Sequence, residues 1–327
     1  MNDMTQLKSV TILVPGTIMD HAASRIGNTF RMVRVAEPDP TLVTPELAAS
    51  VSGIAAFGGI STAFIDALPK LEIISSFGVG YDWVDARYAG TRRIMVTNTP
   101  DVLTEEVADT TIGLLINTVR ELSQAETYLR AGRWVSEGAY PLTRGTLRGR
   151  RAGIFGMGRI GLAVAKRLEV FGLPVAYHNR RPVEGVGYEY HPTLLLLAHS
   201  VDTLISVVPG GAATEKAVDA AVLSALGPNG VFVNIGRGST VDEAALAIAL
   251  ADGTIMAAGL DVFADEPQVP RALLNLSNAT LLPHVGSASV HTRNAMADLV
   301  VDNLVSWFSS GKPLTAVPET AHVTARG

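Results

Sequence analysis

The 327-residue chain contains no cysteine, and this absence excludes disulfide bonds, thiolate catalysis and cysteine-based metal sites. Charged residues are also scarce, at 17% of the chain, whereas 47% of the residues are hydrophobic. This balance is typical of a globular protein and excludes an intrinsically disordered one. The length is sufficient for two domains, each with a core of its own.

The chain also lacks a strong net charge and a long hydrophobic run. A formal net charge of -5 provides no general basic surface for nucleic acid. The apolar run over 194–208 is interrupted by His199, Ser200 and Asp202, so it indicates the end of a helix and a buried strand, not a membrane span. The first apolar run is too short for a secretory signal. We therefore expect a cytoplasmic protein that binds neither nucleic acid nor a membrane.

Apolar segments bounded by glycine or proline alternate with helical segments, and this alternation predicts parallel sheets joined by crossover helices. Strands are expected at 10–14, 54–57, 72–76 and 94–97, and again at 151–155, 174–177, 203–208, 231–235, 257–260 and 280–282. Helices are expected at 62–68, 103–130, 162–171, 215–226, 243–251 and 290–308. Because a further helix follows the second series, the predicted fold is α/β, with two doubly wound parallel-sheet (Rossmann-like) domains, the second inserted into the first.

A glycine-rich segment, Gly156-Met-Gly-Arg-Ile-Gly161, follows one of these strands and precedes a helix. In that context Gly156 permits a tight turn, Gly158 lets the backbone approach a pyrophosphate, and Gly161 lets the helix pack against the strand. The free N–H groups at the helix N-terminus favour an anion. The segment therefore predicts a dinucleotide site, with turn glycines of no binding function as the alternative.

The residues after the next strand predict which dinucleotide binds. An acidic residue there would bind the ribose 2′-hydroxyl group of NAD, but this chain has Asn179, Arg180 and Arg181. An arginine can bind two oxygens of a 2′-phosphate at once. We therefore predict that NADPH is preferred over NADH, and the alternative interpretation is a solvated basic turn.

Three polar residues follow later strands, at the strand ends where ligands bind in open α/β sheets. Arg237, in Asn-Ile-Gly-Arg-Gly, could bind a carboxylate. His284, in Leu-Pro-His-Val-Gly, could exchange a proton with a carbonyl oxygen or an alcohol. Glu266, in Ala-Asp-Glu-Pro, could orient the imidazole and favour its charged form, although Asp265 and Glu243 are competing acids. The set indicates hydride transfer on a 2-oxo or 2-hydroxy acid.

Six motifs together give the chain a specific resemblance to a known family. Over nearly its whole length it resembles the D-isomer-specific 2-hydroxyacid dehydrogenases, and among them the glyoxylate/hydroxypyruvate and hydroxyphenylpyruvate reductases. The motifs are FGVGYDWVD (77–85), VTNTPDVLTEEVAD (96–109), GIFGMGRIG (153–161), NIGRG (234–238), GLDVFADEP (259–267) and LLPHVGS (281–287). The resemblance implies an NAD(P)-binding Rossmann domain at 99–287, inserted into a substrate domain formed by 1–98 and 288–327.

The resemblance also implies residue roles. Arg237 would bind substrate and cofactor, Glu266 would tune His284, and His284 would be the acid/base, while the backbone N–H groups of Val79 and Gly80 would hold the substrate carboxylate. Asp261 would contact the nicotinamide amide. The implied cofactor-binding residues are Gly156, Gly158, Arg159, Ile160, Gly161, Asn179, Arg180, Arg181, Pro209, Thr214, Ile235, Arg237, Asp261, His284 and Gly286. No residue is assigned to a metal.

One segment departs from the family pattern. Val-Pro-Gly-Gly-Ala-Ala-Thr at 208–214 replaces the usual Pro-Leu-Thr type of segment beside the nicotinamide, so the cofactor contacts of Pro209 and Thr214 stay open. Trp134 matches a tryptophan common in this region and has two interpretations, local packing or contact with a partner subunit's site. The helical region 103–130 is expected to form a homodimer, as its counterpart does in the family.

We therefore predict an NADPH-preferring reductase that converts a small 2-oxo acid, of the hydroxypyruvate or glyoxylate type, to a D-2-hydroxy acid with His284 as proton donor. Aryl pyruvates and 2-ketogluconate stay open as substrates, because residues 57–60 and Tyr140 could shape the pocket either way. One alternative is NAD-dependent D-2-hydroxyacid oxidation of the phosphoglycerate or phosphite type, although the loop 77–85 carries no cation for phosphoglycerate. Another is a nucleotide-sensing corepressor-like protein, which the complete Arg–Glu–His set disfavours.

Overall fold

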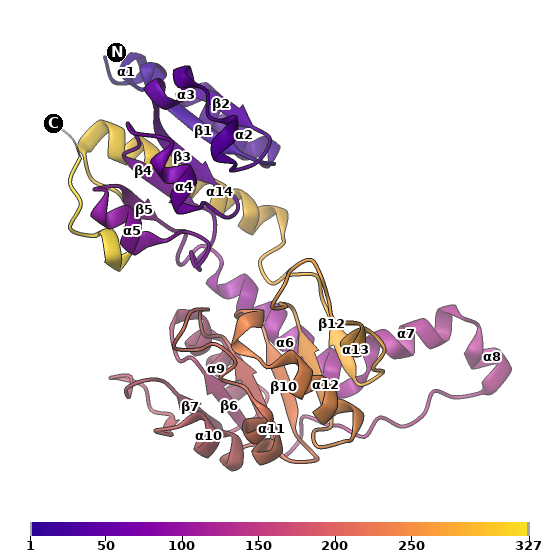
Figure 1. Cartoon of the computed structure of the whole chain (residues 1–327). Coiled ribbons are helices and arrows are strands. Elements are labelled where there is room, and N and C mark those ends of the chain that lie inside the picture. The colour runs from indigo at the N-terminus through magenta and orange to yellow at the C-terminus, as the bar shows by residue number, and fades with distance from the viewer. Residues whose placement is uncertain (1, 326–327) are drawn as a thin grey trace. The chain divides into compact units, whose positions relative to one another are not determined.

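The computed structural model describes residues 2–325, and the chain forms two compact units (Figure 1). Unit 1 comprises Met1–Leu103 and Ser289–Gly327, and unit 2 comprises Thr104–Ala288. The sequence of unit 2 therefore interrupts that of unit 1. Each unit is built on one parallel sheet, which confirms the predicted fold class.

Unit 1 has a five-stranded sheet of order β2-β1-β3-β4-β5. Its strands are β1 (Thr11–Pro15), β2 (Arg31–Val35), β3 (Val51–Ala56), β4 (Ile73–Ser76) and β5 (Met95–Thr97). Its helices are α1 (Asn2–Ser9), α2 (Asp20–Thr29), η1 (Pro40–Leu42), α3 (Pro45–Ser50), α4 (Thr62–Asp66), α5 (Ala86–Thr91), α14 (Val290–Ser310) and η3 (Pro318–Thr320).

The helix α14 returns to the sheet of unit 1 and packs on β3 and β4. A Cβ on Gly53 would lie 3.3 Å from the ring of Phe308, so glycine at this position lets the helix approach β3 closely. The Ser75 hydroxyl group donates to the carbonyl oxygen of Val300 at 3.0 Å. The C-terminal part of the chain thus completes the unit that begins at the N-terminus.

Unit 2 has a seven-stranded sheet of order β12-β11-β10-β9-β6-β7-β8. Its strands are β6 (Ala152–Phe155), β7 (Val175–His178), β8 (Glu189–Tyr190), β9 (Thr203–Ser206), β10 (Val231–Asn234), β11 (Ala257–Leu260) and β12 (Ala279–Leu281). Its helices are α6 (Thr104–Arg120), α7 (Leu122–Arg130), α8 (Arg133–Glu137), α9 (Arg159–Val170), α10 (Leu194–Ser200), α11 (Ala220–Leu226), η2 (Gly238–Thr240), α12 (Glu243–Ala251) and α13 (Arg271–Leu274).

Helices cover both faces of this sheet. Consecutive strand residues point to opposite faces. In β6, a Cβ on Gly153 would lie 3.0 Å from Leu197 of α10. The next residue, Ile154, would lie 3.3 Å from a Cβ on Gly161 of α9, so α10 and α9 cover opposite faces. Each of the strands β6, β9, β10 and β11 has four residues, and all of them are buried, as expected for parallel strands between two helical layers. Within residues 2–325, no helix combines the length and the apolar character that crossing a bilayer requires.

The helical region predicted over 103–130 is two helices. It breaks at Glu121, whose φ of 53° is left-handed. Asn117 stabilises the break, because its Oδ1 accepts the backbone N–H of Ser123 and its Nδ2 donates to the Ser123 hydroxyl group. After the break, α7 and α8 project away from the seven-stranded sheet (Figure 1).

The helix predicted over 215–226 is also shorter than expected. It begins only at Ala220, where the Asp219 side chain accepts the backbone N–H of Val222 at 3.0 Å. The preceding residues form turns, and Lys216 has a left-handed φ of 48°. The segment after β9 is therefore a longer loop than the sequence pattern indicated.

Candidate active site

Every loop predicted to bind a ligand in unit 2 lies at the carboxyl edge of the seven-stranded sheet. The glycine loop follows β6, the Asn179–Arg181 segment follows β7, and Pro209 follows β9. The remaining predicted residues follow β10 (Ile235 and Arg237), β11 (Asp261 and Glu266) and β12 (His284 and Gly286). Because the strands are all parallel, their carboxyl ends meet at one edge, where open α/β sheets bind ligands.

Glu266 and His284 are in hydrogen-bonding contact. His284 Nδ1 lies 2.7 Å from Glu266 Oε2, and Glu266 Oε1 accepts the backbone N–H of Phe263 at 2.9 Å. No hydrogen bond among residues 2–325 uses His284 Nε2, and 43% of this side chain is exposed. The imidazole is therefore held at one nitrogen and open to a ligand at the other.

The charge of Glu266 favours this arrangement. Burial alone would raise the pKa of Glu266, but the hydrogen bonds from His284 and Phe263 and the positive charges of His284 and Arg237 lower that pKa below its usual value. Glu266 is therefore ionised near neutral pH, and its carboxylate can only accept a hydrogen bond, which His284 Nδ1–H donates. The proton on His284 Nδ1 is thereby fixed.

Asp265 and Glu243 occupy different places. Glu243 Oε1 accepts the backbone N–H of Ala264 at 2.9 Å, so it supports the loop that carries Glu266. Burial raises the pKa of Glu243, as do the charges of Asp265 and Glu266, while the N–H of Ala264 opposes the shift. Asp265 is exposed, and its main chain pairs with Gln268. Of the three acids, Glu266 is the one in contact with His284.

The backbone of His284 is strained and strongly supported. Its φ of 53° is left-handed, which is uncommon for a residue with a side chain. The carbonyl oxygen of Asp261 accepts the N–H of His284 at 2.8 Å. The Asp261 carboxylate accepts the N–H groups of Val285 at 2.7 Å and of Gly286 at 2.8 Å. Thr110 of α6 donates to the carbonyl oxygen of Gly286 at 3.1 Å.

Asp261 therefore determines where His284 lies. The residue is 1% exposed, and burial raises the pKa of its carboxyl group. The hydrogen bonds from the N–H groups of Val285 and Gly286 offset this rise only in part. The family resemblance implies that Asp261 contacts the nicotinamide amide, and this role stays a prediction. Its support of the histidine loop is a function that sequence reasoning missed, because no residue type signals a backbone partner.

Arg237 lies in a turn that neighbouring side chains hold through its backbone carbonyl group. Its carbonyl oxygen accepts hydrogen bonds from Asn234 Nδ2 at 2.9 Å and from the Thr240 hydroxyl group at 2.7 Å. A Cβ on the following residue, Gly238, would lie 1.8 Å from the carbonyl carbon of Phe263. Glycine is thus required there, and it lets the Arg237 turn pack against the loop that carries Glu266.

The glycine loop has the shape that a dinucleotide needs. Gly156 has a φ of 107°, and a Cβ on Gly161 would lie 2.2 Å from the carbonyl oxygen of Gly156. A Cβ on Gly158 would meet nothing within 4 Å, so the space above it is open. Arg159 and Ile160 form the first turn of α9, which has no side-chain cap, whereas side chains cap α10, α11 and α12. These N–H groups suit a pyrophosphate.

The loop after β7 is tied to the glycine loop. Asn179 Oδ1 accepts the backbone N–H of Met157 at 2.6 Å. Arg180 and Arg181 follow, both exposed, and neither side chain has a partner within the described part of the chain. The two guanidinium groups are therefore free to bind an anion beside the glycine loop.

The atypical loop after β9 is folded on itself. The Thr214 hydroxyl group donates to the carbonyl oxygen of Pro209 at 2.7 Å. The neighbouring backbone approaches closely, since a Cβ on Gly236 would lie 2.6 Å from the carbonyl oxygen of Val208. Ile235 is buried, and a Cβ on Gly286 would lie 3.3 Å from its Cδ1 atom.

Val79 and Gly80 lie in unit 1, in the loop after β4. Asn98 Nδ2 donates to the carbonyl oxygen of Val79 at 2.8 Å, and Tyr81 donates to Glu319 at 3.0 Å. Burial, together with Glu319, raises the pKa of Tyr81 to about 12, so this donor stays protonated. No hydrogen bond among the described residues uses the N–H group of Val79 or of Gly80.

Comparisons with known proteins address the family of this chain. Residues 112–286 match the family profile "D-isomer specific 2-hydroxyacid dehydrogenase, NAD binding domain". The chain is 42% identical to glyoxylate/hydroxypyruvate reductase A of Arabidopsis thaliana over 314 residues, which cover 95% of this chain and 100% of that protein. It is 48% identical to hydroxyphenylpyruvate reductase of Plectranthus scutellarioides over 256 residues, 78% of this chain and 81% of the relative.

A solved structure is similar over almost the whole chain. The NADPH-dependent glyoxylate/hydroxypyruvate reductase from Sinorhizobium meliloti, in complex with NADP and malonate, is 60% identical, with a TM-score of 0.95 and coverage of 98% of this chain and 99% of that one. The predicted resemblance is thereby confirmed. This chain belongs to the D-isomer specific 2-hydroxyacid dehydrogenase family.

Proposed function

We propose that the protein is an NADPH-preferring reductase that converts a small 2-oxo acid, of the hydroxypyruvate or glyoxylate type, into a D-2-hydroxy acid. The observation that carries the proposal is the 2.7 Å contact between His284 Nδ1 and Glu266 Oε2, at the sheet edge that also carries Arg237 and the glycine loop. The name of the Arabidopsis relative, and that of the S. meliloti reductase, support the substrate class.

Each side chain of the set has one task in this reaction. When bound, the nicotinamide supplies a hydride to C2 of the substrate. The Arg237 guanidinium group binds the substrate carboxylate through its N–H donors. Glu266 holds the Nδ1 proton of His284, so the Nε2 proton is the one delivered to the carbonyl oxygen. The carbonyl group gains one hydride and one proton and becomes a hydroxyl group. Val79 and Gly80 stay predicted donors to the substrate carboxylate.

Replacement of the proton donor tests this mechanism. His284→Gln is expected to lower kcat for hydroxypyruvate and glyoxylate by about 10²–10⁴-fold, the range that a general acid contributes. The Kd of NADPH, measured by fluorescence titration, should stay close to that of the wild type. His199→Gln, an exposed histidine of α10 in the same unit, is the control and should leave kcat unchanged. A His284→Gln variant that retains most of its kcat would remove His284 from the mechanism.

Glu266 and Glu243, two partly exposed acids of the site, are expected to affect stability with opposite dependence on pH. The folded-state pKa of Glu266 is lowered, so its charge stabilises the fold above the ordinary value of 4.5, and this contribution is lost as the pH falls through the folded pKa. Glu266→Gln should therefore be least stable, relative to the wild type, near neutral pH. The pKa of Glu243 is raised, so ionisation of Glu243 weakens the fold as the pH rises above 4.5. Glu243→Gln should gain stability, relative to the wild type, over that range.

Thermal melting of both variants and the wild type, from about pH 7 down to about pH 3.5, measures these differences. As the pH falls, the difference in melting temperature between Glu266→Gln and the more stable wild type should become smaller. The higher melting temperature of Glu243→Gln, relative to the wild type, should disappear over the same range. Parallel changes in the two variants would contradict the assigned electrostatics.

The basic loop after β7 is the proposed source of the NADPH preference. Arg180→Ala is expected to lower the ratio of kcat/KM for NADPH over NADH by about 10-fold or more, because a hydrogen bond to a charged group contributes ~1.5–3 kcal/mol. Arg148→Ala removes another exposed arginine of unit 2 and should leave the ratio unchanged. Steady-state kinetics with both cofactors measures the ratio, and an unaltered ratio in Arg180→Ala would exclude this source.

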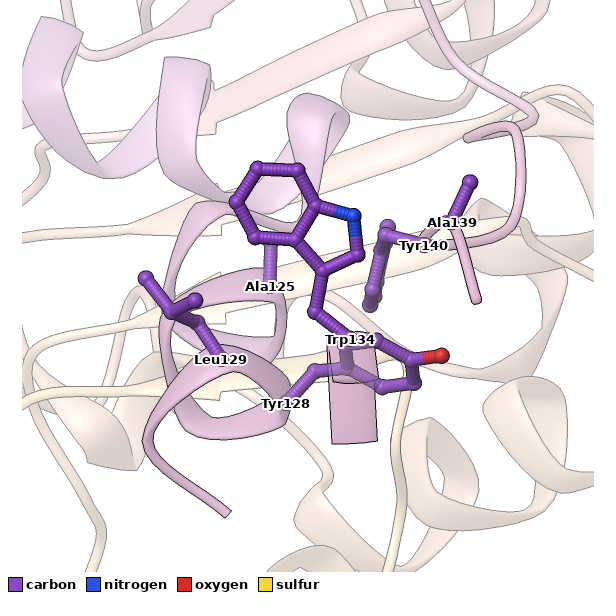
Figure 2. A pocket seen from close by; sticks show the side chains of 6 residues that line it. All are labelled: Ala125, Tyr128, Leu129, Trp134, Ala139 and Tyr140. Atoms are coloured by element: carbon purple, nitrogen blue, oxygen red, sulfur yellow. The ribbon is translucent and has the colours of Figure 1, made fainter. Parts of the chain in front are cut away.

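We also propose that the protein is a homodimer and that the projecting helices α7 and α8 form its interface. These helices carry an apolar pocket of about 330 Å³. Figure 2 shows that the Trp134 indole is one of the side chains that line it. The pocket is lined by Ala125, Tyr128, Leu129, Trp134, Ala139 and Tyr140. Trp134 is 63% exposed, and Val135 and Leu142 are almost fully exposed. Exposed apolar side chains of this size within one short segment of the chain support an interaction surface.

Sedimentation at micromolar concentration tests the dimer. The wild type should sediment as a dimer, and Val135→Glu should dissociate it, because a charge would be buried without a partner at the interface. Val170→Glu is the matched control, since Val170 is 87% exposed at the end of α9. A wild type that sediments as a monomer, or a dimer that tolerates Val135→Glu as well as Val170→Glu, would contradict the proposed interface.

A further inference from the structure

The loop that carries Arg180 and Arg181 is held at both of its ends by tyrosine hydroxyl groups. The hydroxyl group of Tyr190 donates to the carbonyl oxygen of Asn179 at 3.2 Å. The hydroxyl group of Tyr177 accepts the backbone N–H of Val183 at 2.9 Å. Between these two points the arginines are exposed, and their side chains have no partner among the described residues.

The two tyrosines are themselves fixed by the sheet. Tyr177 lies in β7 and is 1% exposed, and Tyr190 lies opposite it in the short edge strand β8. Their ring centroids are 5.5 Å apart. The backbone N–H of His191 donates to the carbonyl oxygen of Tyr177 at 2.8 Å, which keeps β8 in register. A strand of two residues contributes little to the core, but it places a hydroxyl group at the start of the basic loop.

We propose that Tyr177 and Tyr190 are positioning residues for cofactor choice, which act by fixing the backbone of loop 179–183 so that Arg180 and Arg181 meet a 2′-phosphate. This inference rests on the proposed NADPH preference. An arginine loses side-chain entropy when it binds a phosphate, and a loop that is ordered beforehand reduces the total loss. A cofactor without the 2′-phosphate does not engage these guanidinium groups, so it should not depend on the two hydroxyl groups.

Calorimetric titration of the whole protein with NADP⁺ and with NAD⁺ tests the inference in Tyr177→Phe and Tyr190→Phe. Each variant should raise the Kd of NADP⁺ by about fivefold, the effect of one neutral hydrogen bond, and change the Kd of NAD⁺ by less than about twofold. Tyr188→Phe is the control, because the hydroxyl group of Tyr188 bonds to Glu169 outside the loop. It should leave both Kd values unchanged.

A second comparison separates positioning from a general loss of structure. In a variant that already carries Arg180→Ala and Arg181→Ala, the two phenylalanine substitutions should no longer alter the Kd of NADP⁺, because they act through the arginines. An equal rise in the Kd of NADP⁺ and of NAD⁺ in the phenylalanine variants would overturn the inference. If the wild type prefers NADP⁺, an unchanged ratio of the two Kd values in these variants would also overturn it. A wild type that binds NADP⁺ no tighter than NAD⁺ would overturn the NADPH preference and this inference together.

Discussion

The site depends on how closely two loops of unit 2 approach each other. A Cβ on Gly238 would lie 1.8 Å from the carbonyl carbon of Phe263, so no other residue fits there without a shift of the backbone. The backbone N–H of Phe263 in turn holds Glu266, which holds His284. The guanidinium group and the acid/base pair are therefore supported by adjoining backbone. Groups that are fixed before the substrate arrives need no reorganisation during the reaction.

The acids of the site act largely on backbone N–H groups. Glu266, Glu243 and Asp261 each accept at least one, and Asp261 accepts two. Carboxylates are strong acceptors that can bond to several donors, so one acid can hold a loop that has few side-chain contacts. This support allows His284 to keep its left-handed φ of 53°. Asn179 supports the glycine loop through Met157 in the same way.

Much of this arrangement could be predicted from the sequence. Apolar runs bounded by glycine or proline predicted most of the buried strands, and glycines before a helix predicted the dinucleotide loop. The half-exposed edge strand β2 was missed because it has no continuous apolar run. The break at Glu121 depends on bonds between Asn117 and Ser123, which helical periodicity does not encode. The loop support by Asp261 was missed because its partners are backbone groups, which nearly every residue carries.

The most direct test of the account is the decay of NADPH and NADH absorbance by the purified protein with a panel of 2-oxo acids. The panel contains glyoxylate, hydroxypyruvate, hydroxyphenylpyruvate and 2-ketogluconate, so its ranking also reports the size of the substrate pocket. The account predicts turnover of hydroxypyruvate or glyoxylate to the D-hydroxy acid or glycolate, with a higher kcat/KM for NADPH than for NADH. Absence of turnover of every 2-oxo acid with either cofactor would contradict it.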